Sequence, residues 1–152
     1  MDHRYSLEEL NDRFAIADLY DRQLAAAEAW DFAAYDTTFS AEAEIDLSDF
    51  GVPVQRYPAY RRWLASLQPS MPHAQRVTGG LRLALAGDVA TTRVPVVCHV
   101  TMLQDGVRRL TTTGLFYNDR LERTRDGWRI VARREELSWS GDALRNPVPP
   151  PG

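Results

Sequence analysis

The 152-residue sequence contains one cysteine and no lysine, and each shortage removes a class of chemistry. A single cysteine excludes a disulfide framework. Because Cys98 stands in the apolar register of a predicted strand, we interpret it as a buried structural thiol and not as a nucleophile. All 18 basic residues are arginines, so no lysine can form a Schiff base or serve as a base with a lowered pKa.

Metal-binding and nucleotide-binding motifs are also missing. Three scattered histidines and one cysteine give no metal-ligand spacing. The sequence has no glycine-rich loop of the dinucleotide or P-loop type and no Gly-x-Ser-x-Gly elbow. We therefore expect neither a metal nor an organic cofactor.

Long hydrophobic runs and a strong charge of one sign are absent. No apolar run approaches the roughly 20 residues of a membrane span, and the N-terminus lacks the apolar segment of a signal peptide. The net charge is -3, with acids and arginines interspersed, which disfavours nucleic acid or an anionic membrane as a partner. A chain that is 44% hydrophobic over 152 residues predicts one soluble, cytoplasmic domain with one core.

What the sequence does contain is a long β pattern in its second half. The stretch from His73 to His99 reads as one β-hairpin, with Gly87-Asp88 as its turn. Further hairpin turns follow at Asp105-Gly106 and Asp126-Gly127. These signals predict a four-stranded antiparallel meander.

The first half carries three helical patterns and one strand. Ser6 to Glu9 has the form of a capping box, Asp31 is a helix N-cap, and Pro58 suits a first helical turn. The predicted helices span about 7–28, 31–39 and 59–67, and a strand covers about 43–48 before a turn at 49–51. This order predicts an α+β fold whose helices cover one face of a mixed or antiparallel sheet, with the first helix on the concave side.

Several short segments stand in a fixed order: Ile16–Tyr20, Trp30-Asp31 with Phe39, Ala43–Leu47, Gln75-Arg76 before Gly79-Gly80, and Asp126–Ile130 with Trp139. In this order they resemble the nuclear-transport-factor-two-like superfamily, in its SnoaL-like polyketide-cyclase and scytalone-dehydratase-like branch. The resemblance implies a cone-shaped α+β barrel over residues 1–140 with a deep apolar pocket for a small apolar organic substrate. It also implies a homo-oligomer, either a dimer or a trimer. The Pro-rich tail, 141–152, is predicted to be either disordered or an arm on a neighbour.

The catalytic pattern of the dehydratase-like members is not preserved here. Those members place an aspartate four residues before the tryptophan that opens the second helix, and a histidine four residues before the end of the Gly-Gly pair. This chain has Ala26 and Arg76 at these positions, so the Asp-His dyad of a general base is absent. His73 could replace the histidine only if the strand entry were shifted, which would turn a side chain to the other face.

Other resemblances supply further site residues. His99 and Asn118 match pocket residues of scytalone-dehydratase-like members, and Asp46 lies near positions that face the same cavity. With Arg76 they suit polarising a carbonyl or holding an enolate. The predicted catalytic group is therefore His99, Arg76, Asn118, His73 and Asp46, and the predicted pocket wall is Tyr20, Trp30, Leu47, Phe116 and Trp139.

Each of these residues also has a purely structural interpretation. His99 could be a satisfied core histidine, and Asn118 could only connect strands. Arg76 could pair with Glu135 or another acid, and Asp46 could be a solvated strand residue.

Three functions remain open from the sequence. The first is a cofactor-free cyclase, isomerase or lyase of polyketide-like or terpenoid-like metabolism that acts by shape and polarisation, for example in a cycloaddition. The second is a dehydratase or isomerase in which His73 or His99 is the base, with Asp46 or Glu28 as its partner. The third is a non-catalytic binding protein that uses the same pocket.

Overall fold

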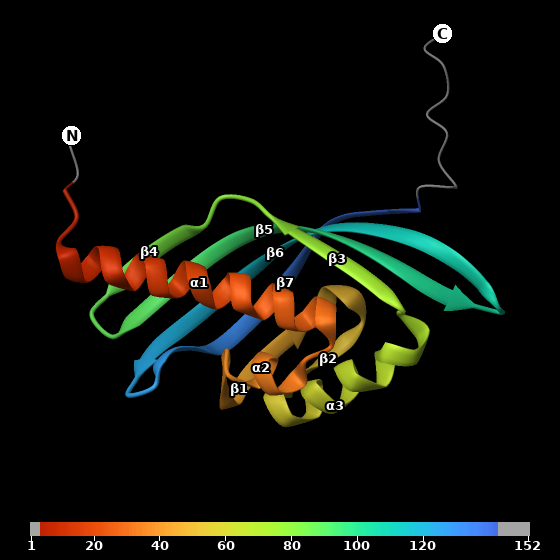
Figure 1. The fold of residues 1–152 in the computed structure, drawn as a ribbon, viewed down its shortest axis with the longest axis horizontal. Coiled ribbons are helices and arrows are strands. Elements are labelled where there is room, and N and C mark those ends of the chain that lie inside the picture. The colour runs from red at the N-terminus through yellow and green to blue at the C-terminus, as the bar shows by residue number, and fades with distance from the viewer. Residues whose placement is uncertain (1–3, 143–152) are drawn as a thin grey trace, which may run out of the picture.

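The computed structural model describes residues 4–142, which form a curved seven-stranded sheet and three α-helices. Figure 1 shows the elements, which follow the chain in this order: α1 (Leu7–Ala29), α2 (Phe32–Asp36), β1 (Phe39–Leu47), β2 (Val52–Arg56), α3 (Tyr57–Leu67), β3 (His73–Thr78), β4 (Arg82–Ala86), β5 (Val89–Gln104), β6 (Val107–Thr124) and β7 (Gly127–Asp142). Short 3-10 turns occupy Ser48–Phe50 and Gln68–Ser70.

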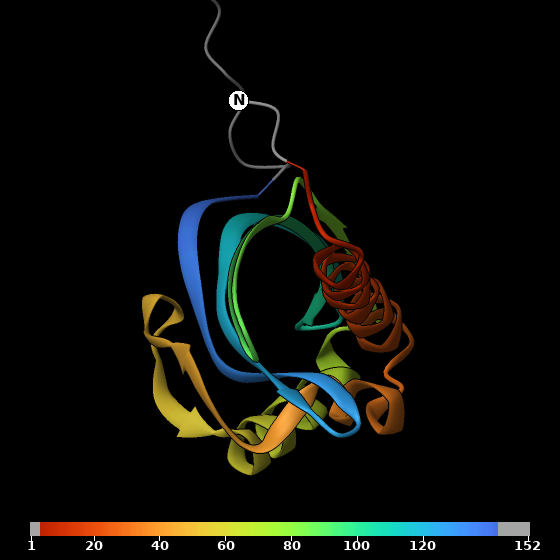
Figure 2. The ribbon, with the colours of Figure 1, turned by 90° about the vertical axis from the view of Figure 1, so that its left-hand side faces the viewer.

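The sheet is mixed, with strand order β2-β1-β7-β6-β5-β3. β4 and β3 lie along the same edge of β5, where β4 pairs with its first part and β3 with its middle part. Only β1 and β7 run parallel among the strand pairs of residues 4–142. Figure 2 shows the sheet curling strongly around its inner face, with α1 across the open side and α2 and α3 along another edge. The predicted α+β fold and the predicted cover by the first helix are both confirmed.

The predicted hairpin turns are the points where the backbone turns back. Gly87, Asp105, Gly106 and Gly127 all adopt positive φ angles, which tight hairpin connections require and which glycine adopts without a steric penalty. The strands β4, β5, β6 and β7 are antiparallel neighbours in chain order, as expected for a meander.

The capping box that begins α1 is present in the structure. The Glu9 N–H donates to Ser6 Oγ at 3.1 Å, and the Ser6 N–H donates to Glu9 Oε2 at 2.8 Å. The helix ends where Trp30 takes a left-handed conformation with φ of 54°, which turns the chain into α2. The buried face of α1 thereby extends from Asp12 to Ala26 against the sheet.

The structure differs from the predicted elements at three places. Phe39 begins β1 instead of ending the second helix, because β1 pairs with β7 from Phe39 onward and the Phe39 ring stacks on Tyr57 at 4.7 Å. The strand Val52–Arg56 was not predicted; it lies on the sheet edge, where its alternation is weak. The segment His73–His99, which was predicted to be one β-hairpin, contains two separate strands, His73–Thr78 and Arg82–Ala86, that each pair with β5.

The C-terminal boundary also lies further along the chain than predicted. β7 runs to Asp142 and pairs with the start of β6 through Thr111, so the predicted tail loses its first two residues to the sheet. The rest of the Pro-rich segment, 143–152, lies outside the described residues. Within the described range, no helix combines the length and apolarity needed to cross a membrane.

Candidate functional site

A cavity of about 480 Å³ lies between the helices and the inner face of the sheet. This volume falls within the about 300–1,000 Å³ that is usual for small-molecule sites. Aromatic side chains from several elements form much of its wall: Trp30, Phe32, Tyr35, Tyr60, Trp63 and Tyr117. Such a wall favours a mostly apolar ligand with ring systems.

Arg76 brings a positive charge into this apolar cavity. It lies on the inner face of the edge strand β3, and its backbone N–H donates to Glu28 Oε1 at 2.8 Å. Burial opposes its charged form, but the negative charges that the neighbouring Tyr117 and Cys98 acquire when they ionise raise the pKa of Arg76 overall. Its buried Nη1 has no hydrogen-bond partner among residues 4–142, so one strong donor remains for a ligand.

Glu135 brings the opposite charge from β7 into the same cavity. Burial raises the pKa of Glu135, and the nearby Arg133 and Arg76 counter this only in part. No ion pair within 4.0 Å joins Glu135 to Arg76 over the described range. The cavity therefore holds a carboxyl group and a guanidinium that are electrostatically coupled without direct contact.

Three tyrosine hydroxyls line the cavity near these charges. The hydroxyls of Tyr35 and Tyr60 lie 3.2 Å apart, and Tyr117 comes from β6. Burial raises the pKa of each of these three phenols above the ordinary value. They remain protonated at neutral pH and can donate hydrogen bonds.

A fully buried ion pair lies next to Tyr117, one of these cavity residues. Asp119 accepts two hydrogen bonds from Arg133, at 2.9 and 2.7 Å, and a third from the Tyr20 hydroxyl at 2.6 Å. The Arg133 guanidinium also lies 3.8 Å from the ring centre of Tyr117. Within the described residues, Arg133 donates these two hydrogen bonds to Asp119 and none to Glu135. It therefore stabilises the charged form of Glu135 only by electrostatic attraction.

The predicted site residues divide between the two faces of the sheet. Arg76, Trp30 and Leu47 line the cavity, and so does Ala26. Tyr20 is buried in the core, where its hydroxyl contacts Asp119 and Thr92. The other predicted residues do not line the cavity: His73, His99, Asn118, Asp46, Phe116 and Trp139.

Strand pairing explains why His99 is separated from Arg76. Arg76 pairs with Cys98, and Gln75 pairs with His99. Paired residues on neighbouring strands share a face, so Arg76 and Cys98 face inward together while His99 faces outward. There, His99 Nδ1 lies 3.0 Å from Thr112 Oγ1. The expectation that His99 and Arg76 share one cavity is not met.

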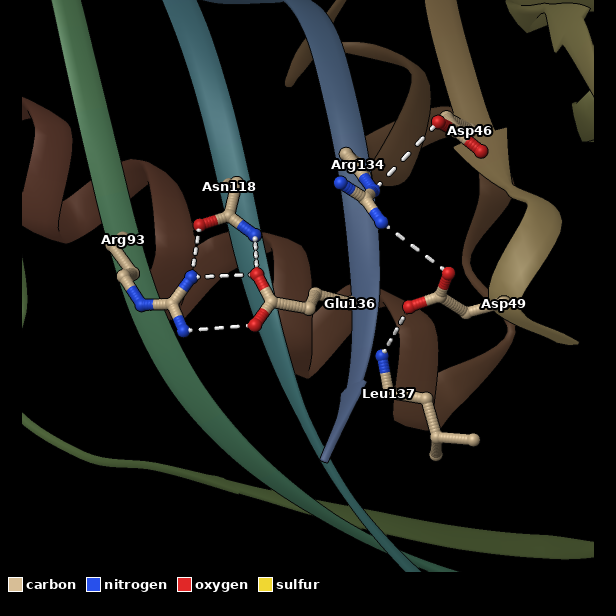
Figure 3. Close-up of polar contacts among 7 residues, drawn as sticks. All are labelled: Asp46, Asp49, Arg93, Asn118, Arg134, Glu136 and Leu137. Atoms are coloured by element: carbon tan, nitrogen blue, oxygen red, sulfur yellow. Dashed lines mark hydrogen bonds and ion pairs between the residues drawn. The ribbon is translucent and has the colours of Figure 1, made fainter. Parts of the chain in front are cut away.

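Asn118 and Asp46 belong to a polar group on the outer face, which Figure 3 shows in detail. Arg93 forms two hydrogen bonds to Glu136, at 2.8 and 3.1 Å, and a third to Asn118 Oδ1 at 2.6 Å. Asp46 pairs with Arg134 at 3.9 Å. Since these groups satisfy one another, they connect strands, as the structural interpretation of Asn118 expected.

Phe116, Trp139 and His73 also lie away from the cavity. The Arg93 guanidinium lies 3.8 Å from the ring centre of Phe116 on the outer face. Trp139 is 48% exposed, and its indole covers Gly114, where a Cβ would clash with it. His73 is exposed at the start of β3.

Sequence reasoning missed Glu135 and Gln23 as cavity residues. A signal for Glu135 exists, because Arg133, Arg134, Glu135 and Glu136 are four consecutive charged residues in one strand. Alternation forces half of such a run to face the interior. Among the described residues, no group of three or more histidine, cysteine, aspartate or glutamate side chains could hold a metal ion.

A curved sheet with a long helix across its open side and a cavity between them defines the cone fold of the nuclear-transport-factor-two-like superfamily. Within it, the SnoaL-like domain family matches residues 8–134, and the chain belongs to this family.

Known proteins agree with this assignment. The uncharacterized protein Rv2910c of Mycobacterium tuberculosis is 33% identical over 131 residues, which cover 86% of this chain and 88% of that protein. The hexachlorocyclohexane dehydrochlorinase LinA-type3 of Novosphingobium barchaimii is 19% identical with a TM-score of 0.79, covering 95% of this chain and 99% of that one. Kfla4162 of Kribbella flavida is 21% identical with a TM-score of 0.78, covering 86% and 93%. The resemblance inferred from the sequence is confirmed for the fold and the family.

Proposed function

We propose that this protein is an isomerase or lyase that needs no cofactor and moves a proton on a mostly apolar, carbonyl-bearing small molecule. One observation carries the proposal: Glu135 is a half-buried carboxyl group that lines an apolar cavity close to Arg76, and the Nη1 of Arg76 has no partner among the described residues. A carboxylate in such a place is a stronger base than one in water. A guanidinium beside it can hold the negative charge that proton removal creates.

The chemistry follows from these two groups. The carboxylate of Glu135 takes a proton from the carbon next to the substrate carbonyl, and the electron pair moves onto the carbonyl oxygen. Arg76 and the Tyr117 hydroxyl donate hydrogen bonds to that oxygen. Return of the proton to another carbon gives an isomer, whereas loss of a leaving group from the next carbon gives an elimination product.

In this mechanism Glu135 is the base, in place of the histidine base of the second hypothesis from the sequence. His73 and His99 do not line the cavity, so the geometry supports Glu135 in the role of base. Elimination also fits the fold, which is shared with a protein named hexachlorocyclohexane dehydrochlorinase. A polyketide-like or terpenoid-like substrate, ring closure, the cytoplasmic location and the dimer or trimer stay predictions.

Hydrogen exchange with solvent tests the proton transfer without the natural substrate. Deoxybenzoin and 1-indanone are apolar aromatic ketones with exchangeable hydrogens beside the carbonyl, and mass spectrometry in D₂O measures deuterium uptake. We expect the wild-type protein to accelerate uptake by at least one of these ketones. Glu135→Gln should slow it about a hundredfold or more, and Arg76→Met by a similar factor.

Matched variants outside the cavity control for general damage. Glu136→Gln makes the same chemical change one residue further along β7, and His99→Gln removes the histidine of the earlier hypothesis; both should retain the wild-type rate. Wild-type exchange in Glu135→Gln would contradict the proposed base. Exchange no faster than in buffer for both ketones would favour the non-catalytic binding protein.

A further inference from the structure

Gln23 is a fully buried polar residue of the cavity wall that the proposed mechanism does not use. It is 1% exposed and lines the cavity from α1. Ala26 and Ala27 line the cavity from the same helix, and their spacing of three and four residues from Gln23 places all three on one helical face. Gln23 therefore reaches the ligand space one helical turn before Ala26.

Hydrogen bonds fix which end of the Gln23 amide is available. The Thr38 hydroxyl donates its single proton to the Tyr35 carbonyl at 2.7 Å. Toward Gln23 the same hydroxyl can only accept, so the group 2.9 Å from it is the amide nitrogen Nε2. The orientation of the amide is thus dictated by Thr38 and not by an arbitrary choice between its two ends.

The other end of the amide is an acceptor without a partner. Gln23 Oε1 is buried and has no hydrogen-bond partner within residues 4–142, and the same holds for the donor Nη1 of Arg76, another residue that lines the cavity. A buried polar atom without a partner is costly, so a ligand that satisfies it is favoured over one that does not. The apolar cavity is therefore lined by one residue with an unpartnered acceptor and one with an unpartnered donor.

We infer that Gln23 is a specificity-determining residue that accepts a hydrogen bond from a ligand hydroxyl while Arg76 donates to a ligand oxo group. The ligand class is an apolar ring compound that carries both a hydroxyl and a ketone. The inference rests on the proposed function, because it assigns the substrate of the same cavity. A ketone whose hydroxyl is methylated would leave Oε1 unpaired and bury the ether oxygen beside it.

Benzophenones test this recognition separately from the chemistry. They have the ketone and two apolar rings but no hydrogen on the carbon beside the carbonyl, so Glu135 cannot turn them over. Calorimetry measures the affinity of 3- and 4-hydroxybenzophenone and of the two corresponding methoxybenzophenones. We expect at least one hydroxyl compound to bind about tenfold or more tightly than its methyl ether. The same preference should persist in Glu135→Gln, so loss of catalysis and loss of recognition are distinguishable.

Three variants locate the preference at Gln23. In Gln23→Met, which keeps the length of the side chain, the affinity ratio should fall to about one because no acceptor remains. Gln104→Met makes the same change at the other glutamine of the cavity wall and should keep the wild-type ratio. In Thr38→Val the amide is free to turn and donate to the ether oxygen, so the ratio should also fall.

Several results would overturn the inference. They are a wild-type protein that binds neither hydroxybenzophenone, one that binds both hydroxyl compounds no tighter than their ethers, and a folded Gln23→Met that keeps the wild-type ratio. If Gln23→Met does not fold, the wild-type ratio and Thr38→Val still decide the question.

Discussion

Glu135 and Glu136 are adjacent residues of β7 whose carboxyl groups lie on opposite faces of the sheet and have opposite pKa shifts. Glu135 faces the cavity, and burial raises its pKa. Glu136 faces outward, where hydrogen bonds from Arg93 lower its pKa to about 2. Since successive strand residues alternate in direction, one step along the chain separates a destabilising carboxylate from a stabilising one.

Glu135→Gln should stabilise the protein at neutral pH. The native state holds the Glu135 proton more tightly than the unfolded state does, so the stability of the wild type falls as pH rises above the unfolded value of about 4.3. The gain of the variant should therefore be absent below about pH 4 and fully present above the raised native pKa. Urea unfolding from pH 3 to 8 measures it, and a Glu135→Gln protein less stable than wild type at pH 8 would contradict the argument.

Glu136→Gln should show the reverse behaviour. Its lowered native pKa contributes stability that is present above the unfolded value of about 4.3 and is lost as pH falls toward about 2. The variant should be less stable than wild type at pH 7, and the difference should shrink as pH falls toward about 2 and vanish below that value. Because the pair with Arg93 is partly exposed, 0.5 M NaCl should shrink the difference. A difference that persists undiminished at pH 2 would argue against this assignment.

Asp119→Asn should be strongly destabilising because it leaves the Arg133 charge buried without its partner. Both side chains are at most 1% exposed, and breaking such a pair costs about 3–5 kcal/mol. Asp88→Asn is the matched control: this side chain is 81% exposed beside Arg123, and its loss should cost less than about 1 kcal/mol. Urea unfolding at pH 7 compares the two variants, and equal costs would refute the special role of the buried pair.

The sequence predicted the features that depend on local chemistry. The capping box of Ser6 and Glu9, the turn at Gly87 and the order of helices and strands each follow from a few neighbouring residues. The family resemblance then supplied the curvature of the sheet and the presence of a pocket, which local patterns do not encode.

The side of the sheet on which each polar residue lies could not be predicted in the same way. His99 and Cys98 differ by one position, and only the pairing of Arg76 with Cys98 decides which of them faces the cavity. Irregular pairings between Gly114 and Leu115 and between Arg120 and Leu121 also change the phase of β7 against β6. These bulges carry no distinct sequence signal, so Trp139, which was expected in the pocket wall, lies on the outer face, while Glu135 lines the cavity.

We predict that the self-association implied by the family resemblance uses the outer face of the sheet. Apolar side chains on this face include Val77, Val97, Leu103, Leu110 and Trp139, several of them well exposed. Exposed apolar groups of this kind mark association surfaces. We expect a dimer or trimer by sedimentation velocity that dissociates in Val97→Arg but not in Phe14→Arg, which places the same charge on an exposed part of α1. A wild-type monomer at high micromolar concentration would contradict this.

Cys98 should react slowly with iodoacetamide, and a cavity ligand should slow the reaction further. It is the only cysteine of the chain, it lines the cavity, and burial raises its pKa although Arg76 acts in the opposite direction. Because the thiolate is the reacting species, alkylation at pH 8 should be at least about tenfold slower than that of free cysteine, whose pKa is about 8.5. The rate should keep rising above pH 9, and protein unfolded in guanidinium should react at the rate of free cysteine.

Saturating 3-hydroxybenzophenone should protect the Cys98 thiol in the wild type. Because the ligand loses a hydrogen-bond partner in Gln23→Met, it should protect the thiol less well in that variant. Alkylation of the native protein as fast as that of free cysteine would show that Cys98 is not held in this buried position.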